Sequence, residues 1–127
     1  MNNKRKRSYK DLEVYQMAHK VAVELHNFSL KLPKYEMYET GSQLRRASKS
    51  ISANIVEGYG RRRYKAEYIR YLIFAHSSNN EAIEWLEYIR DCHPAHKDIS
   101  TDYLVGMDKL GRKLNRFIQA VEKEHLI

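Results

Sequence analysis

The amino-acid sequence predicts an all-α protein, folded as an up-down-up-down antiparallel four-helix bundle. Only two prolines and five glycines punctuate 127 residues, which is too few turns for an all-β chain and favours long helices. Hydrophobic residues make up 43% of the chain, which is enough to build a core. They recur at spacings of three and four in four segments, and the short links between these segments force successive helices to run antiparallel.

The first two helices follow from apolar stripes and their stop signals. Apolar residues recur on one face over residues 12–32, and Pro33 ends this helix. After a short polar link, Thr40 and Gln43 have the spacing of a capping box, in which each side chain satisfies a free N–H group of the first turn. We therefore expect the second helix to begin at Thr40 and to end at the glycines near residue 60.

The last two helices follow from longer patterns of the same kind. The third runs from about residue 64 to residue 92, and Pro94 closes it. At 1.5 Å per residue it would be roughly 40 Å long. The fourth extends to Val121, with Asp98 or Ser100 as its N-cap.

The chain length suits one domain, for which we assign residues 11–127, preceded by a basic and flexible arm at residues 1–10. No stretch of 18 apolar residues predicts a membrane span, and no apolar segment follows the basic start as it would in a secretory signal. Cys92 is the single cysteine. Because it has no partner for an internal disulfide, the sequence favours a reducing compartment, the cytoplasm.

The formal net charge is +7, and it is unevenly distributed. Residues 66–108, which include most of the third helix, are acidic in sum. The cations gather in three clusters, which are Lys4, Arg5, Lys6, Arg7 and Lys10; Arg61, Arg62, Arg63 and Lys65; and Lys109, Arg112, Lys113 and Arg116. Clusters of this kind indicate a surface that binds a polyanion, rather than a uniformly basic surface that only keeps the protein soluble.

Polar residues interrupt the apolar pattern at two places. The second helix carries a polar stripe beside its apolar seam, and residues 77–81 in the third helix read Ser-Ser-Asn-Asn-Glu. One interpretation is a solvated face, with small residues that let helices approach closely. The other is a buried or inter-subunit polar network, which must be fully hydrogen-bonded to be tolerated. Its candidate members are Arg45, Arg46, Ser50, Asn54, Glu57 and Glu81.

Two segments resemble a known family. Residues 9–18 read YKDLEVYQMA, and residues 42–61 read SQLRRASKSISANIVEGYGR. Together they resemble the bacterial four-helix-bundle proteins named after reading frames in 23S ribosomal RNA intervening sequences, and the resemblance covers nearly the whole chain. The second segment is the more specific of the two, because chance is a poor explanation for a match of this length.

The resemblance implies a four-helix bundle that assembles into a ring, a homopentamer, without enzymatic activity. It also implies a distant similarity to the accessory protein of diversity-generating retroelements, which binds nucleic acid and a reverse transcriptase. The family name reports genomic location only, so a role in ribosomal RNA does not follow from it.

The first functional hypothesis is an oligomer that binds RNA or DNA with little sequence specificity. Each Lys or Arg that contacts a phosphate releases counterions, and a ring repeats these contacts. Tyrosines beside the 61–65 loop could stack on unpaired bases. The predicted binding residues are Lys4, Arg5, Lys6, Arg7, Lys10, Tyr59, Arg61, Arg62, Arg63, Tyr64 and Lys65. The alternative is that the basic residues bind no ligand and form a solubilising tail and a solvated loop. For Arg45 and Arg46, carboxylates and phosphates both remain open as partners.

Two further hypotheses belong to other classes. Aromatic side chains on the third helix exceed what one core can bury, which favours an interaction scaffold for itself or another protein. Arg70 and His76 have the spacing found in all-α ribonucleases of the HEPN type, but six residues on a helix turn the two side chains to different faces. No metal or cofactor is expected, because Cys92, His93 and His96 offer only three ligands without the usual zinc spacing.

Overall fold

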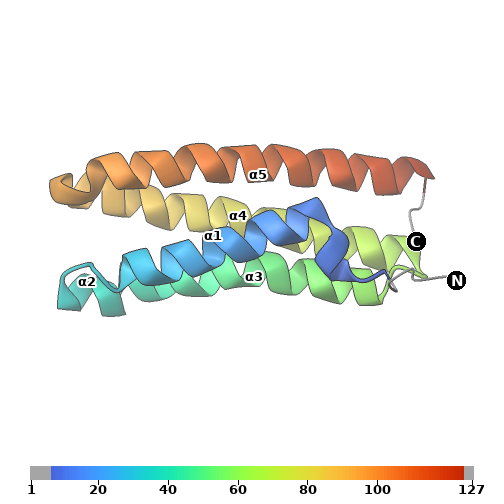
Figure 1. Cartoon of the computed structure of the whole chain (residues 1–127), viewed down its shortest axis with the longest axis horizontal. Helices are drawn as coiled ribbons and strands as arrows, with labels where there is room; N and C mark the ends of the chain where they lie inside the picture. Colours follow the sequence, from blue (N-terminus) through green and yellow to red (C-terminus); the bar gives the residue numbers. More distant parts are fainter. Residues whose placement is uncertain (1–6, 125–127) are drawn as a thin grey trace, which may run out of the picture.

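Four long helices account for most of the structure, a computed structural model that describes residues 7–124. Their bounds are Glu13–Ser29 for α1, Thr40–Gly60 for α3, Lys65–Cys92 for α4 and Lys97–Glu124 for α5. Each runs antiparallel to the one before it (Figure 1). α1 packs on α3, α3 on α4 and α4 on α5, and a sparser interface between α5 and α1 closes the bundle. The predicted all-α helical bundle is confirmed, and the described residues contain no strand.

Three short elements precede or connect these helices. The 3-10 turns η1 and η2 span Tyr9–Asp11 and Pro94–His96, and the short helix α2 spans Lys34–Tyr38. The sequence pattern predicts only a polar link where α2 lies. Five residues hold too little periodicity to indicate a helix.

The core is built from one stripe on each long helix. The largest fully buried side chains are Leu25, Leu44, Ile51, Ile55, Tyr68, Leu72, Leu86, Ile89, Met107, Leu110, Leu114 and Val121. With the smaller or slightly more exposed buried residues, such as Val14, Ala18, Ala22 and Phe28 on α1, they follow the three-and-four spacing that predicts an amphipathic helix. The sequence therefore assigns the helical faces correctly.

The start of α3 differs from the prediction. Thr40 is its first residue, but the N-cap residue is Glu39, whose side chain forms no capping hydrogen bond. The Thr40 N–H instead donates to a carboxylate oxygen of Glu36, 3.1 Å away. The Gln43 N–H donates to the carbonyl oxygen of Glu39 at 3.3 Å. The predicted capping box is therefore wrong, because α2 supplies a carboxylate to the helix N-terminus, where a negative charge is favourable.

The start of α5 also differs from the prediction. The helix begins at Lys97, so Asp98 lies in its first turn and Ser100 is fully buried inside it. Neither is the N-cap. Pro94 begins η2, and Lys97 closes that turn in the α-helical backbone conformation. Because the turn leads directly into the helix, no extended residue remains to act as a side-chain cap.

Candidate nucleic-acid interface

The turn between α3 and α4 carries one of the predicted basic clusters. After Gly60, the Arg61 N–H donates to the Gly58 carbonyl at 3.0 Å and the Tyr64 N–H donates to the Arg61 carbonyl at 2.9 Å. Tyr64 then adopts an extended conformation, with φ −108° and ψ 104°, and α4 begins at Lys65. These bonds fold four cations into one compact turn, which are Arg61, Arg62, Arg63 and Lys65.

Arg61 is engaged within the protein. Its Nε lies 3.2 Å from a Glu57 carboxylate oxygen, and its guanidinium also pairs with Glu67 at 3.3 Å. The same guanidinium lies 4.9 Å from the ring centre of Tyr71. The hydrogen bond to Glu57 and the nearby negative charges raise the pKa of Arg61 above its usual value. Much of its charge is therefore compensated before any ligand arrives.

Arg62 covers Tyr59, one of the two tyrosines predicted to stack on bases. Its guanidinium lies 3.9 Å from the ring centre of Tyr59, and its Nη1 donates to the Tyr59 carbonyl at 2.8 Å. The Tyr59 ring also meets Tyr68 edge to face, with 6.5 Å between ring centres. A base that stacks on the outer face of Tyr59 must therefore displace Arg62 or lie on top of it.

The rest of the turn is open to solvent. Arg63 is exposed, Lys65 is half-buried, and neither forms an ion pair with any residue that the structure describes. Tyr64 is 65% exposed. Arg63 and Lys65 thus keep uncompensated positive charge beside an accessible aromatic ring, which is the combination that single-stranded nucleic acids bind.

Antiparallel packing brings other cations to the same end of the bundle. On α5, Lys113 Nζ lies 2.6 Å from Glu13 Oε1 at the start of α1. The hydrogen bond from Lys113 and its charge hold the pKa of Glu13 below its usual value. This contact sets the start of α1 beside the second half of α5, and the chain before η1 leads from there toward the end that holds the α3–α4 turn (Figure 1). Four more exposed cations belong to this basic end, which are Arg7, Lys10, Arg116 and Lys123.

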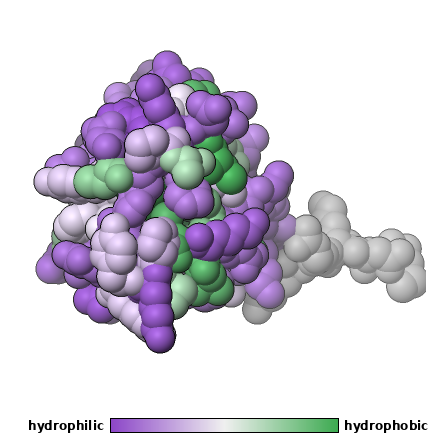
Figure 2. All heavy atoms as spheres, turned by 90° about the vertical axis from the view of Figure 1, so that its left-hand side faces the viewer, coloured by the Kyte–Doolittle hydropathy of each residue, from purple (hydrophilic) through white to green (hydrophobic). Residues whose placement is uncertain are grey.

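The opposite end of the bundle has a different character. There α2 and η2 connect the helices, and the exposed charged residues are three lysines and three acids, which are Lys31, Lys34, Glu39, Asp91, Lys97 and Asp98. Figure 2, which looks onto this end, shows hydrophilic side chains interspersed with smaller hydrophobic areas. The basic end has exposed carboxylates as well, on Glu57, Glu122 and Glu124, but its cations outnumber them although they come from segments far apart in the sequence.

The described part of the predicted basic arm runs into an ordered turn. Ser8 accepts a hydrogen bond from the Lys10 N–H, and its own N–H donates to the Asp11 carboxylate, which forms a capping box. Gln16 Nε2 donates to the Lys10 carbonyl at 2.8 Å and ties this turn to α1. Three further predicted binding residues lie outside the described residues, which are Lys4, Arg5 and Lys6.

The candidate members of one polar network separate into local contacts. Asn54 Nδ2 donates to the carbonyl and the hydroxyl of Ser50, at 2.8 and 3.2 Å. Glu57 pairs with Arg61, and Glu81 accepts from Trp85 Nε1 at 3.1 Å. Within this one chain, these contacts do not connect Glu57 with Glu81.

Arg45 and Arg46 are neighbours with different surroundings. Arg45 Nη1 donates to the Ser29 hydroxyl at 2.7 Å, and its Nη2 donates to the Met37 carbonyl at 3.0 Å. Arg45 therefore ties the end of α1 and α2 to α3, and neither of the predicted partner types, carboxylate or phosphate, is needed to explain it. Arg46 is exposed.

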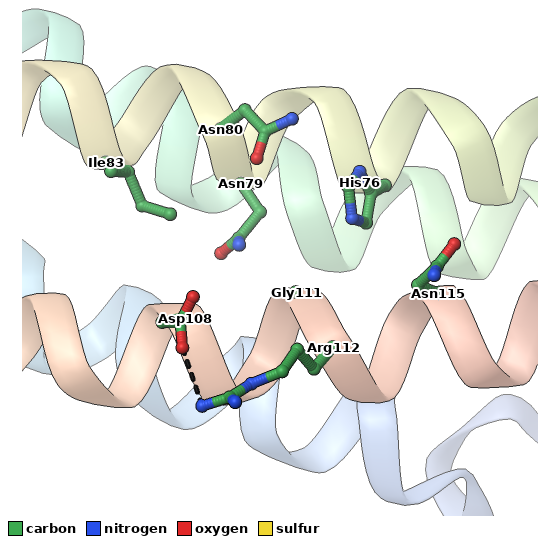
Figure 3. A pocket seen from close by; sticks show the side chains of 8 residues that line it. All are labelled: His76, Asn79, Asn80, Ile83, Asp108, Gly111, Arg112 and Asn115. Atoms are coloured by element: carbon green, nitrogen blue, oxygen red, sulfur yellow. Dashed lines mark ion pairs between the residues drawn. The ribbon is translucent and has the colours of Figure 1, made fainter.

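A buried polar contact does occur, between α4 and α5 (Figure 3). Asn79 is fully buried, and its Nδ2 donates to the Met107 carbonyl at 3.0 Å. It faces Gly111, where an added Cβ would lie 3.0 Å from that nitrogen. Beside it is a cavity of about 260 Å³ with a polar lining that includes His76, Asn80, Asp108, Arg112 and Asn115. The polar run at 77–81 signals this contact in the sequence, but nothing there identifies its partner.

The arginine and histidine of the ribonuclease hypothesis have separate surroundings. Arg70 pairs with Glu67 at 3.6 Å, and its guanidinium lies 5.4 Å from the Phe74 ring centre. His76 lines the cavity between α4 and α5. Over residues 7–124, no three His, Cys, Asp or Glu side chains are grouped so that they could hold a metal ion. None of the described helices is long and apolar enough to cross a membrane.

Comparisons with known proteins agree with this architecture. A crystal structure of a protein of unknown function from Bacteroides thetaiotaomicron VPI-5482, of the S23 ribosomal protein family, is similar with a TM-score of 0.75. The match covers 84% of this chain and 95% of that one at 21% sequence identity, so it shows the fold alone. No curated protein matches the chain. The family model described as 23S rRNA-intervening sequence protein matches residues 10–116. Since this range spans most of the chain, the protein belongs to the 23S rRNA-intervening sequence protein family.

Proposed function

We propose that this protein is not an enzyme, that it forms a homo-oligomer, and that it binds RNA or DNA through the basic end of its bundle. The observation that carries the proposal is that Arg7 and Lys10, the cations of the 61–65 turn, and Arg116 and Lys123 on α5 all lie toward that end, while charges of both signs balance at the other end. Lys109 and Arg112 lie in the middle of α5, where Arg112 pairs with Asp108 at 2.6 Å. Had the clusters been scattered over the bundle, solubility alone would explain them. Gathered together, they form a surface that attracts phosphates.

Binding at this surface should depend little on base sequence. The uncompensated cations sit in a turn and near helix ends, and Arg63 and Lys65 are the clearest examples. Cations in such positions contact phosphates, which position a nucleic acid without reading it. No helix of the bundle is presented as a separate recognition helix, because all four long helices pack side by side.

The proposed assembly is a ring of identical subunits, a homopentamer, as the family resemblance implies. On α4, Tyr71 packs against Phe74 and Trp85 against Tyr88, with 5.5 and 6.0 Å between ring centres. Phe74 remains 40% exposed and Tyr88 remains 51% exposed. Aromatic side chains left open in this way are enriched at subunit interfaces. An assembled ring would repeat the basic end, so that one polyanion meets several copies.

The test is a salt titration of nucleic-acid binding, monitored by fluorescence anisotropy with a single-stranded RNA and with a DNA duplex. We expect binding at low salt and a steep loss of affinity as salt rises. The triple variant Arg63→Ala, Lys65→Ala, Arg116→Ala should bind more weakly. Its matched control removes three exposed lysines from the opposite end: Lys31→Ala, Lys34→Ala, Lys97→Ala. Absence of binding at low salt, or equal weakening by both triples, would contradict the proposal.

The alternative function is a scaffold or accessory subunit for another protein, such as a reverse transcriptase or a ribosomal component. The exposed aromatic face of α4 favours it, because the same face suits a foreign partner. Light scattering after size exclusion separates the two uses of this face. If the protein forms an oligomer by itself and Tyr88→Lys dissociates that oligomer, the aromatic face of α4 joins identical subunits. A monomer whose α4 face is covered only by an added partner would support the scaffold.

A further inference from the structure

A second cavity opens at the basic end itself. Its volume is about 500 Å³, and it lies where the η1 turn, the end of α3, the start of α4 and the last turns of α5 meet. One wall is aromatic and consists of Tyr59, Tyr68 and Phe117. The other wall is polar, with Arg7, Ser8 and Asp11, and Leu12 completes the lining.

The aromatic wall is rigid. Tyr68 is 1% exposed. It meets Tyr59 edge to face at 6.5 Å between ring centres, and it meets Phe117 in the same way at 6.2 Å. Edge-to-face contacts of this kind hold each ring in place. Because Tyr68 is almost completely covered, the ring surface that a flat ligand can reach belongs to Tyr59 and Phe117, which are half-buried and which Tyr68 holds in place.

The cavity also presents hydrogen-bonding groups. Burial raises the pKa of Tyr68 to about 12, so its phenol stays neutral and keeps its proton at physiological pH. Its hydroxyl forms no hydrogen bond with any described residue. On the polar wall, the Asp11 carboxylate accepts from the Ser8 N–H at 2.9 Å. A ligand with acceptors on its edge can accept the proton of the Tyr68 hydroxyl, and Arg7 on the polar wall offers further donors.

Positive charge borders this cavity. Arg7 lines it directly. Arg62 lies over the Tyr59 ring at 3.9 Å. Its charge also acts on Tyr68, where it lowers the pKa of the phenol, although burial has the larger and opposite effect. Arg63 and Lys65 follow in the same turn, without ion-pair partners among the described residues. A ligand seated in the cavity can therefore carry phosphates that remain outside, against these cations.

We propose that this cavity holds one unpaired nucleobase of a single strand whose phosphates lie on the basic end. The inference rests on the proposed function and adds to it a preference for single strands. A base is flat, stacks on aromatic rings and has donors and acceptors along its edge, which matches the walls. A duplex must first unpair and turn out a base before it can use the site, so it should bind through phosphate contacts alone.

The experiment compares a single-stranded oligonucleotide with an abasic strand of the same length at equal salt. The two carry the same phosphates, so their affinity ratio isolates the base. For the native sequence we expect the strand with bases to bind about tenfold more tightly. Leu12→Trp fills the cavity without a change of charge, and it should bring the ratio close to one while leaving the abasic affinity unchanged. Val105→Trp adds the same ring at an exposed position of α5 and should keep the ratio.

The outcomes separate this inference from the proposed function. Equal affinity for the two strands in the native protein, with normal salt dependence, overturns the cavity assignment and leaves phosphate binding intact. If neither strand binds at low salt, both fail. If circular dichroism shows that Leu12→Trp does not fold, Tyr68→Phe decides, because it keeps the ring and removes only the hydroxyl. We expect it to lower the ratio about threefold, and an unchanged ratio would overturn the assignment.

Discussion

His93 Nε2 lies 2.7 Å from Glu36 Oε2, although 57 positions separate the two residues. Both side chains are almost entirely buried, with 11% and 9% of their surfaces exposed. The same carboxylate accepts the Thr40 N–H at the start of α3. One carboxyl group from α2 thus joins the start of α3 to the end of α4, at the end of the bundle opposite the basic one.

Glu36→Gln should destabilise the protein. The substitution keeps the size of the side chain but replaces a charged acceptor of two hydrogen bonds with a neutral amide. Hydrogen bonds to charged groups contribute about 1.5–3 kcal/mol each, so we expect a loss of about 2 kcal/mol in the free energy of unfolding, measured by urea denaturation at neutral pH. Glu39→Gln, an exposed glutamate three residues away, is the control and should change little. Equal stabilities of the two variants would contradict this account.

The same pair predicts a pH dependence. Burial alone would raise the pKa of Glu36, but the hydrogen bonds from His93 and Thr40 outweigh it and hold the pKa below its usual value of 4.5. A lowered pKa in the folded state stabilises the protein above the unfolded pKa, and this stabilisation is lost as the pH falls through the folded value. The stability advantage of the native sequence over Glu36→Gln should therefore shrink below about pH 4.5. An advantage that grows in acid would refute the assignment.

Gly111→Ala and Gly106→Ala should have opposite effects. A Cβ at Gly111 would lie 3.0 Å from Asn79 Nδ2, whereas a Cβ at Gly106 would have no neighbour within 4 Å. Asn79 cannot move away without losing its bond to the Met107 carbonyl. In a helix, alanine is favoured over glycine by about 1 kcal/mol, so Gly106→Ala should raise the melting temperature. Overpacking at Gly111 costs about 1–3 kcal/mol and should lower it.

Arg45→Ala and Arg46→Ala should separate structure from binding. Arg45 donates to the Ser29 hydroxyl and to the Met37 carbonyl. We expect its removal to cost about 1–3 kcal/mol in the free energy of unfolding, with unchanged nucleic-acid affinity for the folded fraction. Arg46 is exposed, and its removal should change stability by less than about 0.5 kcal/mol. Paired denaturant titrations measure the difference. Similar costs for the two would mean that the Arg45 contacts are energetically unimportant.

Salt dependence should report how many phosphates the basic end neutralises. Removal of one cation that neutralises a phosphate reduces the slope of log affinity against log salt by about 0.9 on duplex DNA and about 0.7 on a single strand. Arg63→Ala should therefore lower the slope by this amount, whereas Arg61→Ala should lower it less, because Arg61 is already paired with Glu57 and Glu67. Anisotropy titrations at several salt concentrations give both slopes. A larger effect of Arg61 would indicate that it exchanges its carboxylates for phosphates on binding.

The helices and their buried faces could be assigned from the sequence because they depend on local signals. The three-and-four spacing of apolar residues marks the buried stripe of each helix. Pro33 and Pro94 mark the ends of two of these patterns, because proline cannot continue a helix. The caps of the helices that begin at Thr40 and Lys97 could not be predicted in this way. There a carboxylate from α2, or a turn continuous with the helix, replaces the side-chain cap that the local sequence predicts.

The candidate site divides in the same way. The sequence by itself determined that the cations occur in clusters and that Tyr59 and Tyr64 flank the cluster at 61–65. Only the tertiary structure decided that cations from separate segments lie toward one end, that Tyr59, Tyr68 and Phe117 wall one cavity, and that Glu36 finds His93. Helix periodicity is a property of neighbouring residues. The meeting of residues 57 positions apart depends on how antiparallel helices align end to end, which no local spacing encodes.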